Sequence, residues 1–140
     1  MGHSGRLGVL VGFVLLISML LLSQPTKEKH VVSVDEARAL IAKDSTVLVL
    51  DVRTREEYTG ELGHIDRAVL IPVQELEKRI DELEPYKGKT ILAVCRTGRR
   101  SANATEILTK SGFKAMNVEG GMVKWNEKKM PVVREKKQAD

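Results

Sequence analysis

The chain has 140 residues with a net charge of +4, and 42% of its residues are hydrophobic. This length can bury one modest hydrophobic core but not two. The 23 basic side chains are scattered among 19 acidic ones with no basic stripe interleaved with aromatic residues, which argues against nucleic-acid binding. One cysteine and three dispersed histidines offer no metal-ligand spacing, so neither a metal nor an internal disulfide is expected.

The chain starts with a long apolar segment. Every residue from 7 to 22 is apolar, Gly or Ser, and no charge lies between Arg6 and Lys27. At about 1.5 Å per residue, a helix of this length reaches the short end of a bilayer core, so we predict an N-terminal apolar helix. We divide the chain into a tail at residues 1–6, a transmembrane anchor or signal segment at residues 7–23, a linker at residues 24–30, a folded domain at residues 31–133 and a polar tail at residues 134–140.

The residues around the apolar segment bear on its cleavage and orientation. An uncleaved anchor is favoured over a cleaved signal peptide, because residues 21–23 offer only one small residue where an A-x-A-like site is needed. Arg6 ahead of the segment resembles an export signal and favours a domain outside the cytoplasm, in the periplasm or at the cell surface. Lys27 and Lys29 weaken that charge bias, so the cytoplasmic face stays open as the alternative.

The remaining residues alternate between strand and helix patterns. Ser33 to Glu36 forms a capping-box pattern that predicts the start of a short amphipathic helix. Residues 47–52 form a continuous apolar run, typical of a strand buried on both faces. Further along we expect a short strand at residues 70–73, a helical segment carrying Leu76, Ile80 and Leu83, a strand at residues 90–94, a helix at residues 101–110 and a strand at residues 115–118. This order predicts an α/β domain with a parallel sheet covered by helices on both faces.

The only cysteine follows the strand predicted at residues 90–94. It opens a six-residue segment, Cys95, Arg96, Thr97, Gly98, Arg99 and Arg100, just before the next helix. The helix N-terminus and the three arginines are both expected to lower the pKa of Cys95, whose thiolate is the form that attacks. Gly98 suits a loop that turns its N–H groups inward around an anion. The segment therefore predicts a sulfur nucleophile in an anion-binding loop.

Four other groups of residues accompany this loop. They are Asp51-Val52-Arg53 with Glu57-Tyr58, Gly63-His64-Ile65 with Ala68 and Ile71-Pro72, Gly120-Gly121, and Trp125. With the loop they cover residues 31–133 in an order that resembles the rhodanese homology domain, in particular the single-domain sulfurtransferases. One position departs from the family pattern, because Arg67 stands where glycine is usual. A different local backbone and an extra cation near the site are therefore expected.

The resemblance implies sulfur transfer without a cofactor. Cys95 would attack the outer sulfur of thiosulfate or a related sulfane donor, form a persulfide, and pass that sulfur to cyanide or to a small or protein thiol. Arg96, Arg99 and Arg100 would hold the anionic group of the donor. The backbone N–H groups of residues 96–100, which include Thr97 and Gly98, would stabilise the persulfide. The resemblance also implies structural or supporting roles for Asp51, Arg53, His64 and Ser101. Because aromatic residues are scarce, Trp125 is expected in the core rather than in contact with a substrate, and we expect a monomer.

Two other functions stay open. Cysteine phosphatases and arsenate reductases also place a Cys-Arg loop at a helix N-terminus, but in their C-x5-R pattern the arginine lies six positions after the cysteine. Here Arg100 lies five positions after Cys95 and the sixth position is Ser101, so the loop makes a smaller cradle. The third possibility is a non-catalytic rhodanese module that docks a partner. Such silent copies typically lack the cysteine that this chain keeps.

Overall fold

The computed structural model describes residues 29–135. Five parallel strands form one sheet in the order β1-β5-β4-β2-β3. The strands are β1 (Val31–Val32), β2 (Leu48–Asp51), β3 (Val69–Leu70), β4 (Thr90–Val94) and β5 (Lys114–Val118). The helices are α2 (Val34–Lys43), α3 (Arg55–Tyr58), α4 (Arg99–Lys110) and α5 (Gly121–Glu127), with 3-10 segments η1 (Val73–Glu75) and η2 (Glu77–Tyr86). The predicted α/β architecture is confirmed.

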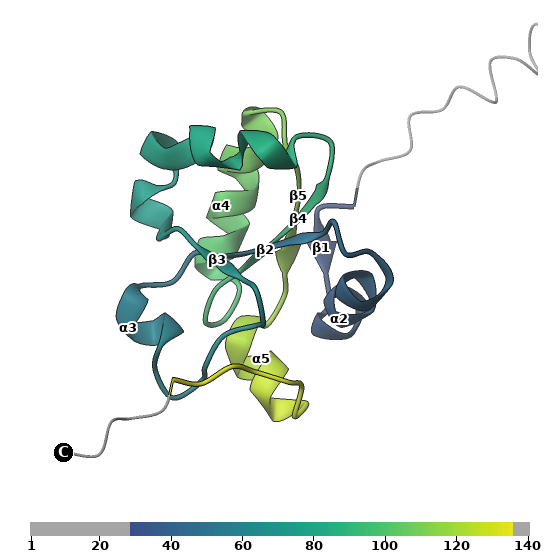
Figure 1. The fold of residues 1–140 in the computed structure, drawn as a ribbon, viewed down its shortest axis with the longest axis vertical. Coiled ribbons are helices and arrows are strands. Elements are labelled where there is room, and N and C mark those ends of the chain that lie inside the picture. The colour runs from purple at the N-terminus through teal and green to yellow at the C-terminus, as the bar shows by residue number, and fades with distance from the viewer. Residues whose placement is uncertain (1–28, 136–140) are drawn as a thin grey trace, which may run out of the picture.

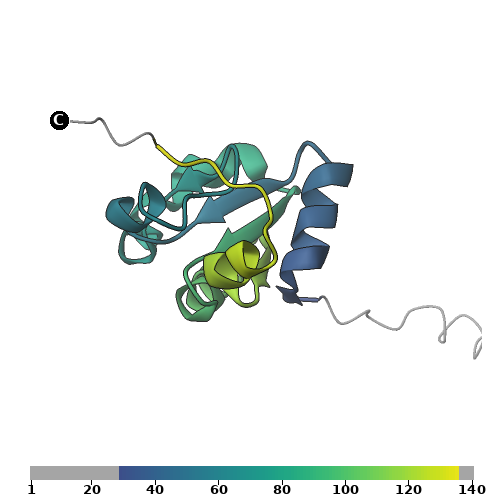
Figure 2. The same cartoon turned by 90° about the horizontal axis from the view of Figure 1, so that it is seen from below.

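Two hydrophobic clusters hold helices on opposite faces of the sheet. Alternate residues of β2 and β4, such as Leu50 and Ile91, pack with Leu108 of α4 and with η1 and η2. The residues between them, such as Leu92, pack with α2 and with Trp125 of α5. Figures 1 and 2 show α2 and α5 on one side of the strands and α4 on the other. Because β4 lies at the centre of this sandwich, the residue that follows it is held between two packed layers.

Most predicted elements are present with shifted ends. The capping box at Ser33 begins α2 as predicted: the Ser33 side chain accepts from the backbone of Glu36, and the Glu36 carboxylate accepts from the backbone of Ser33. In the segment predicted to be helical, Ile80 and Leu83 lie in the 3-10 helix η2, which also contains Pro85, and Leu76 lies between η1 and η2. The sequence prediction missed β1, α3 and α5, all of which are short.

The membrane predictions lie outside the described residues. The tail at residues 1–6 and the anchor or signal segment at residues 7–23 are among them, so their cleavage and orientation stay predictions. Within residues 29–135, no helix has the length and apolar character to cross a bilayer.

Arg67 takes the backbone conformation that suits glycine. Its φ is 59°, so the turn that precedes β3 keeps a left-handed residue although the side chain is arginine. The expected change of local backbone is therefore wrong. The expected extra cation at the site is also wrong. Arg67 has an exposed side chain and lines a hollow together with Val47 and Leu48, at the edge of the sheet where β2 begins, whereas Cys95 follows the end of β4.

We expect Arg67→Gly to stabilise the fold by about 0.5–1 kcal/mol, because it removes left-handed strain that exceeds the entropic cost of glycine. Thermal unfolding should move up by about 2–6 °C. Lys43→Gly, in the last turn of α2, is the control and should destabilise the fold by about 0.5–1 kcal/mol. An unfolding temperature lowered by Arg67→Gly would show that the arginine side chain contributes more than its backbone strain costs.

Candidate functional site

Cys95 lies directly after the central strand β4, in the loop that leads into α4. The loop reverses at Gly98, which precedes the first residue of α4 and has a φ of 105°. Cys95 is buried, with only 1% of its surface exposed. The sequence prediction of a strand, a cysteine loop and a helix is confirmed, and it places the sulfur at the carboxyl edge of the sheet.

The Cys95 sulfur lies within hydrogen-bonding distance of two donor groups, the Gly98 N–H and the Ser101 hydroxyl. The Gly98 N–H lies 3.1 Å from Sγ and the Ser101 hydroxyl oxygen lies 3.2 Å from it. Burial raises the pKa of the thiol, but the Ser101 hydroxyl together with the backbone N–H groups of Ser101, Gly98 and Thr97 lowers it by more, so the net pKa lies below its ordinary value. The predicted direction is confirmed, with donors of the loop rather than the arginine charges as the main cause.

The N-terminus of α5 fixes the loop from the other side. The Met122 N–H donates to the carbonyl of Cys95 at 2.8 Å, and the Val123 N–H donates to the carbonyl of Arg96 at 3.0 Å. These two carbonyls are therefore held by α5, which fixes the backbone of the loop that carries the donors to the sulfur. A Cβ on Gly121 would lie 2.4 Å from the Cys95 oxygen and 2.6 Å from the Arg96 oxygen. Only glycine allows α5 to approach the loop this closely.

Gly121→Ala should therefore move the loop and reduce alkylation of Cys95 by iodoacetamide at neutral pH by about 10-fold, because the sulfur would lose donors that stabilise its thiolate. It should also cost about 2–4 kcal/mol of stability through the collision and the left-handed φ of 56°. Gly88→Ala is the matched control, because Gly88 also has a positive φ, of 77°, but has nothing within 4 Å of its added Cβ. Equal alkylation rates in the two variants would contradict this account of the loop.

An open cavity of about 410 Å³ lies over the sulfur. It is lined by Cys95, Thr97, Arg99, Arg100 and Asn103. The structure thus brings four predicted residues together around one hollow, while Gly98 lies buried in the loop and the exposed Arg96 does not line the cavity. Asn103 was missed in the sequence, although it follows Arg99 by one helical turn and so shares its face of α4.

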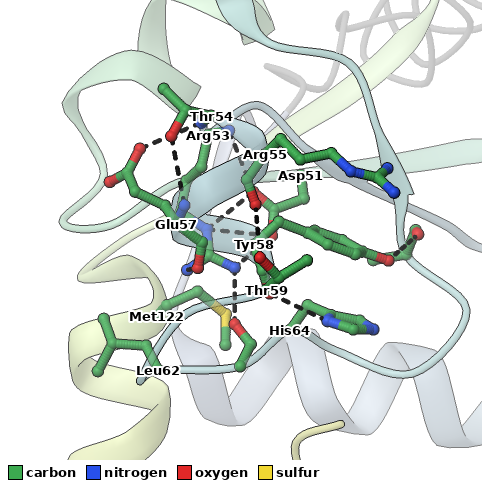
Figure 3. A network of polar contacts seen from close by, with 12 residues as sticks. Asp51, Arg53, Thr54, Arg55, Glu57, Tyr58, Thr59, Leu62, His64 and Met122 are labelled. Carbon is green, nitrogen blue, oxygen red and sulfur yellow. Dashed lines mark hydrogen bonds and ion pairs between the residues drawn. The ribbon is translucent and has the colours of Figure 1, made fainter. Parts of the chain in front are cut away.

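A polar network joins β2 to α3 (Figure 3), and Glu57 of this network also pairs with Arg100 next to the cysteine loop. Arg53 is 1% exposed, and its guanidinium donates to both carboxylate oxygens of Asp51, the shortest contact being 2.7 Å. It also donates to the backbone carbonyls of Gly63 and Glu57. The Glu57 carboxylate in turn accepts two 2.7 Å hydrogen bonds from Arg100. The predicted Asp51–Arg53 pair is thus buried, and it reaches the loop through Glu57.

Arg100 is a paired cation rather than a free one. Its hydrogen bonds lower the pKa of Glu57 to about 2 from an ordinary value of 4.5. The capping box of α3 fixes the carboxylate, because the Thr54 side chain and the Glu57 side chain each bond the other's backbone N–H. Arg99 is exposed, and no ion pair involving it is found among residues 29–135. Within the cavity it is therefore the arginine more available to an anion.

The Glu57–Arg100 pair should make the free energy of unfolding depend on pH. A carboxyl whose pKa is lower in the folded chain stabilises the fold above its unfolded value of 4.5, and that contribution is lost as the pH falls toward 2. We expect Glu57→Gln to cost about 1–2 kcal/mol at pH 7, because the pair is bidentate and partly buried. The difference from the unsubstituted chain should shrink in urea titrations as the pH is lowered through this window. A difference in stability that stays constant with pH would contradict this contribution of the Glu57–Arg100 pair.

His64 is buried in the domain and does not line the cavity over Cys95. It is 8% exposed, its ring stacks on Tyr58 with the centroids 3.8 Å apart, and its Nδ1–H donates to the Tyr58 carbonyl. Its backbone pairs with Val133 near the end of the described chain. Trp125 is buried as predicted, and its indole N–H donates to the carbonyl of Pro131 at 2.9 Å.

Comparison with known proteins finds relatives across this region. Residues 33–128 match the family model described as a rhodanese-like domain. YtwF of Bacillus subtilis, named provisionally as a sulfurtransferase, is 36% identical over 91 residues, which are 65% of this chain and 84% of YtwF. Thiosulfate sulfurtransferase PspE of Escherichia coli is 37% identical over 73 residues, 52% of this chain and 68% of PspE. A rhodanese-related protein of Thermoplasma volcanium, of known crystal structure, superposes with a TM-score of 0.68 at 33% identity, covering 76% of this chain and 99% of that one.

YrkF of Bacillus subtilis, named provisionally as a sulfur carrier protein, is 39% identical over 98 residues, 69% of this chain. The match covers only 51% of the length of YrkF. The chain therefore spans about half the length of that relative.

Proposed function

Because the chain belongs to the rhodanese-like domain family, we propose that it is a sulfurtransferase that moves a sulfane sulfur atom through a persulfide on Cys95. The observation that carries the proposal is the arrangement of the loop, in which the buried sulfur accepts from the Gly98 N–H and lies 3.2 Å from the Ser101 hydroxyl oxygen, at the floor of a cavity with two arginines. The relatives named as sulfurtransferases support the same reaction class.

The first half of the reaction would load the sulfur. The Cys95 thiolate attacks the outer sulfur of thiosulfate, the new Sγ–S bond forms, and the S–S bond of thiosulfate breaks with its electron pair leaving on sulfite. The negative charge is then on the outer sulfur of the persulfide. Arg99 would attract the dianionic donor, and the loop N–H groups would stabilise the anionic sulfur, as preorganised donors do.

The second half would return the thiolate. Cyanide or a thiolate acceptor attacks the outer sulfur, the Sγ–S bond breaks, and its electron pair stays on Cys95. The cavity over the sulfur is open, so the persulfide is reachable by a thiol on a small molecule or on a protein. The provisional naming of YrkF as a sulfur carrier agrees with a protein acceptor. All steps use the protein's own sulfur, so we propose no cofactor.

Intact-mass spectrometry of the full chain, before and after thiosulfate and then after cyanide, tests the proposal. We expect a gain of one sulfur atom that cyanide removes as thiocyanate. Because Cys95 is the only cysteine, a sample alkylated with iodoacetamide is a site-specific control and should gain nothing. A persulfide formed from polysulfide but not from thiosulfate would overturn thiosulfate as the donor. Release of phosphate from p-nitrophenyl phosphate without any sulfur adduct would overturn sulfur transfer in favour of a phosphatase.

A further inference from the structure

The hydroxyl of Ser101 lies between two acceptors but has one hydrogen to donate. Its oxygen is 3.2 Å from the Cys95 sulfur and 2.6 Å from Oδ1 of Asn117 on β5. Two oxygens at 2.6 Å need a hydrogen between them, and an amide oxygen carries none, so the Ser101 hydroxyl must supply it. The hydrogen bond to Asn117 and the hydrogen bond to the thiolate therefore exclude each other.

Because the site is buried, an acceptor that loses the Ser101 hydrogen bond has little solvent to replace it. Ser101 is 0% exposed and Asn117 is 9% exposed, and among residues 29–135 no buried side-chain oxygen or nitrogen lacks a partner. Solvent is thus poorly placed to replace whichever bond is given up. A hydrogen bond to an anion is roughly twice as strong as one between neutral groups. Ser101 should therefore turn to Cys95 when the sulfur is a thiolate and to Asn117 when it is neutral.

We propose that Asn117 is a positioning residue that takes the Ser101 hydrogen bond whenever the Cys95 sulfur carries no charge. It opposes ionisation of the free thiol, and it stabilises the persulfide, in which the charge has moved to the outer sulfur. This second role rests on the proposed function, whereas the first concerns only the thiol. In a complete cycle the hydroxyl would turn toward Asn117 as sulfur is loaded and back toward Cys95 as sulfur leaves.

The charged groups around the sulfur stay in place when Asn117 is changed. They are Arg99 and Arg100 on α4, Glu57 on α3, which pairs with Arg100, and the buried pair of Asp51 and Arg53 from β2. Among the described residues, none of them forms a hydrogen bond with Asn117. A change in Cys95 ionisation caused by Asn117→Ala is therefore expected to pass through Ser101.

The rate of alkylation of Cys95 by iodoacetamide across pH tests the first role in the full chain. Asn117→Ala should move the midpoint to lower pH and, below that midpoint, raise the rate about three- to tenfold, the value of one competing neutral hydrogen bond. Asn117→Asp keeps an acceptor and adds a negative charge, so it should move the midpoint the other way. In a Ser101→Ala background, Asn117→Ala should leave the midpoint unchanged. A midpoint raised or unmoved by Asn117→Ala, or a shift that persists without the Ser101 hydroxyl, would overturn the proposal.

The persulfide gives a second readout that a merely structural role would not produce. At fixed thiosulfate and sulfite, Asn117→Ala should lower the ratio of persulfide to free Cys95 about three- to tenfold, as measured by intact mass. Asn117→Ala should at the same time speed the release of sulfur to cyanide. If the unsubstituted chain never loads sulfur, sulfur transfer fails and the alkylation series still decides the role of Asn117. If sulfur loads but neither the midpoint nor the ratio moves, the role of Asn117 fails and sulfur transfer stands.

Discussion

Replacing Cys95 with serine is expected to abolish sulfur loading, with a loss of at least about 1,000-fold in the rate of thiocyanate formation. The serine hydroxyl is a weak nucleophile at its ordinary pKa, and the donors that favour a thiolate here cannot ionise it near neutral pH. The fold should persist, because serine is slightly smaller than cysteine and can bond the same N–H of Gly98. Thermal unfolding should shift by no more than about 5 °C.

A transplanted thiol provides the control for this variant. Cys95→Ser combined with Ser111→Cys keeps one cysteine in the chain but places it at the exposed C-terminal end of α4. There the helix presents carbonyl groups and a partial negative charge, which disfavour a thiolate. We expect no cyanide-labile sulfur on this double variant. Equal loading on it and on the unsubstituted chain would mean that any accessible thiol suffices, and the loop would have no special role.

The sequence was most informative where pattern and function coincide. The segment from Thr90 to Lys110 has a buried strand, a cysteine loop and an amphipathic helix in direct succession, and the structure confirms all three. Local signals suffice there because an apolar run, a glycine and a helical period each act over a few residues. The capping box at Ser33 succeeded for the same reason.

The contacts between distant residues could not be read in this way. Glu57 and Arg100 are 43 positions apart, and nothing local to either of them predicts their bidentate pair. Asn117 gave no signal either, because a lone polar residue in a short strand does not reveal which side chain will face it. Thr54 and Glu57 do form a capping-box pattern, so α3 was predictable and was overlooked. Arg67 was misjudged because a family pattern fixes a backbone conformation, which arginine can adopt at a cost.

The second large effect is expected at Arg53. Substituting methionine for Arg53 should destabilise the fold by about 3–5 kcal/mol, because it leaves the Asp51 carboxylate buried without its partner. Asp51 is 0% exposed, and its carboxylate accepts hydrogen bonds from the Arg53 guanidinium and from the Arg53 backbone N–H, of which only the second would remain. The substitution also removes donors to the carbonyls of Gly63 and Glu57, so α3 and its contact with Arg100 should loosen. Urea unfolding followed by circular dichroism measures the loss, which is a large fraction of the stability of a domain of this size.

Two control variants distinguish the cost of leaving the buried Asp51 charge unpaired from the cost of removing an arginine side chain. Arg79→Met removes an arginine whose pairs with Glu75 and Glu82 are largely exposed, so it should cost less than about 1 kcal/mol. Arg53→Met with Asp51→Asn removes both charges, so it should recover part of the stability that Arg53→Met loses. If the double variant were as unstable as the sum of its single variants, the carbonyls of Gly63 and Glu57 rather than the Asp51 charge would account for the contribution of Arg53. Arg53 would then stabilise the fold through its hydrogen bonds to these two backbone carbonyls, and α3 would still reach the cysteine loop through the pair of Glu57 and Arg100.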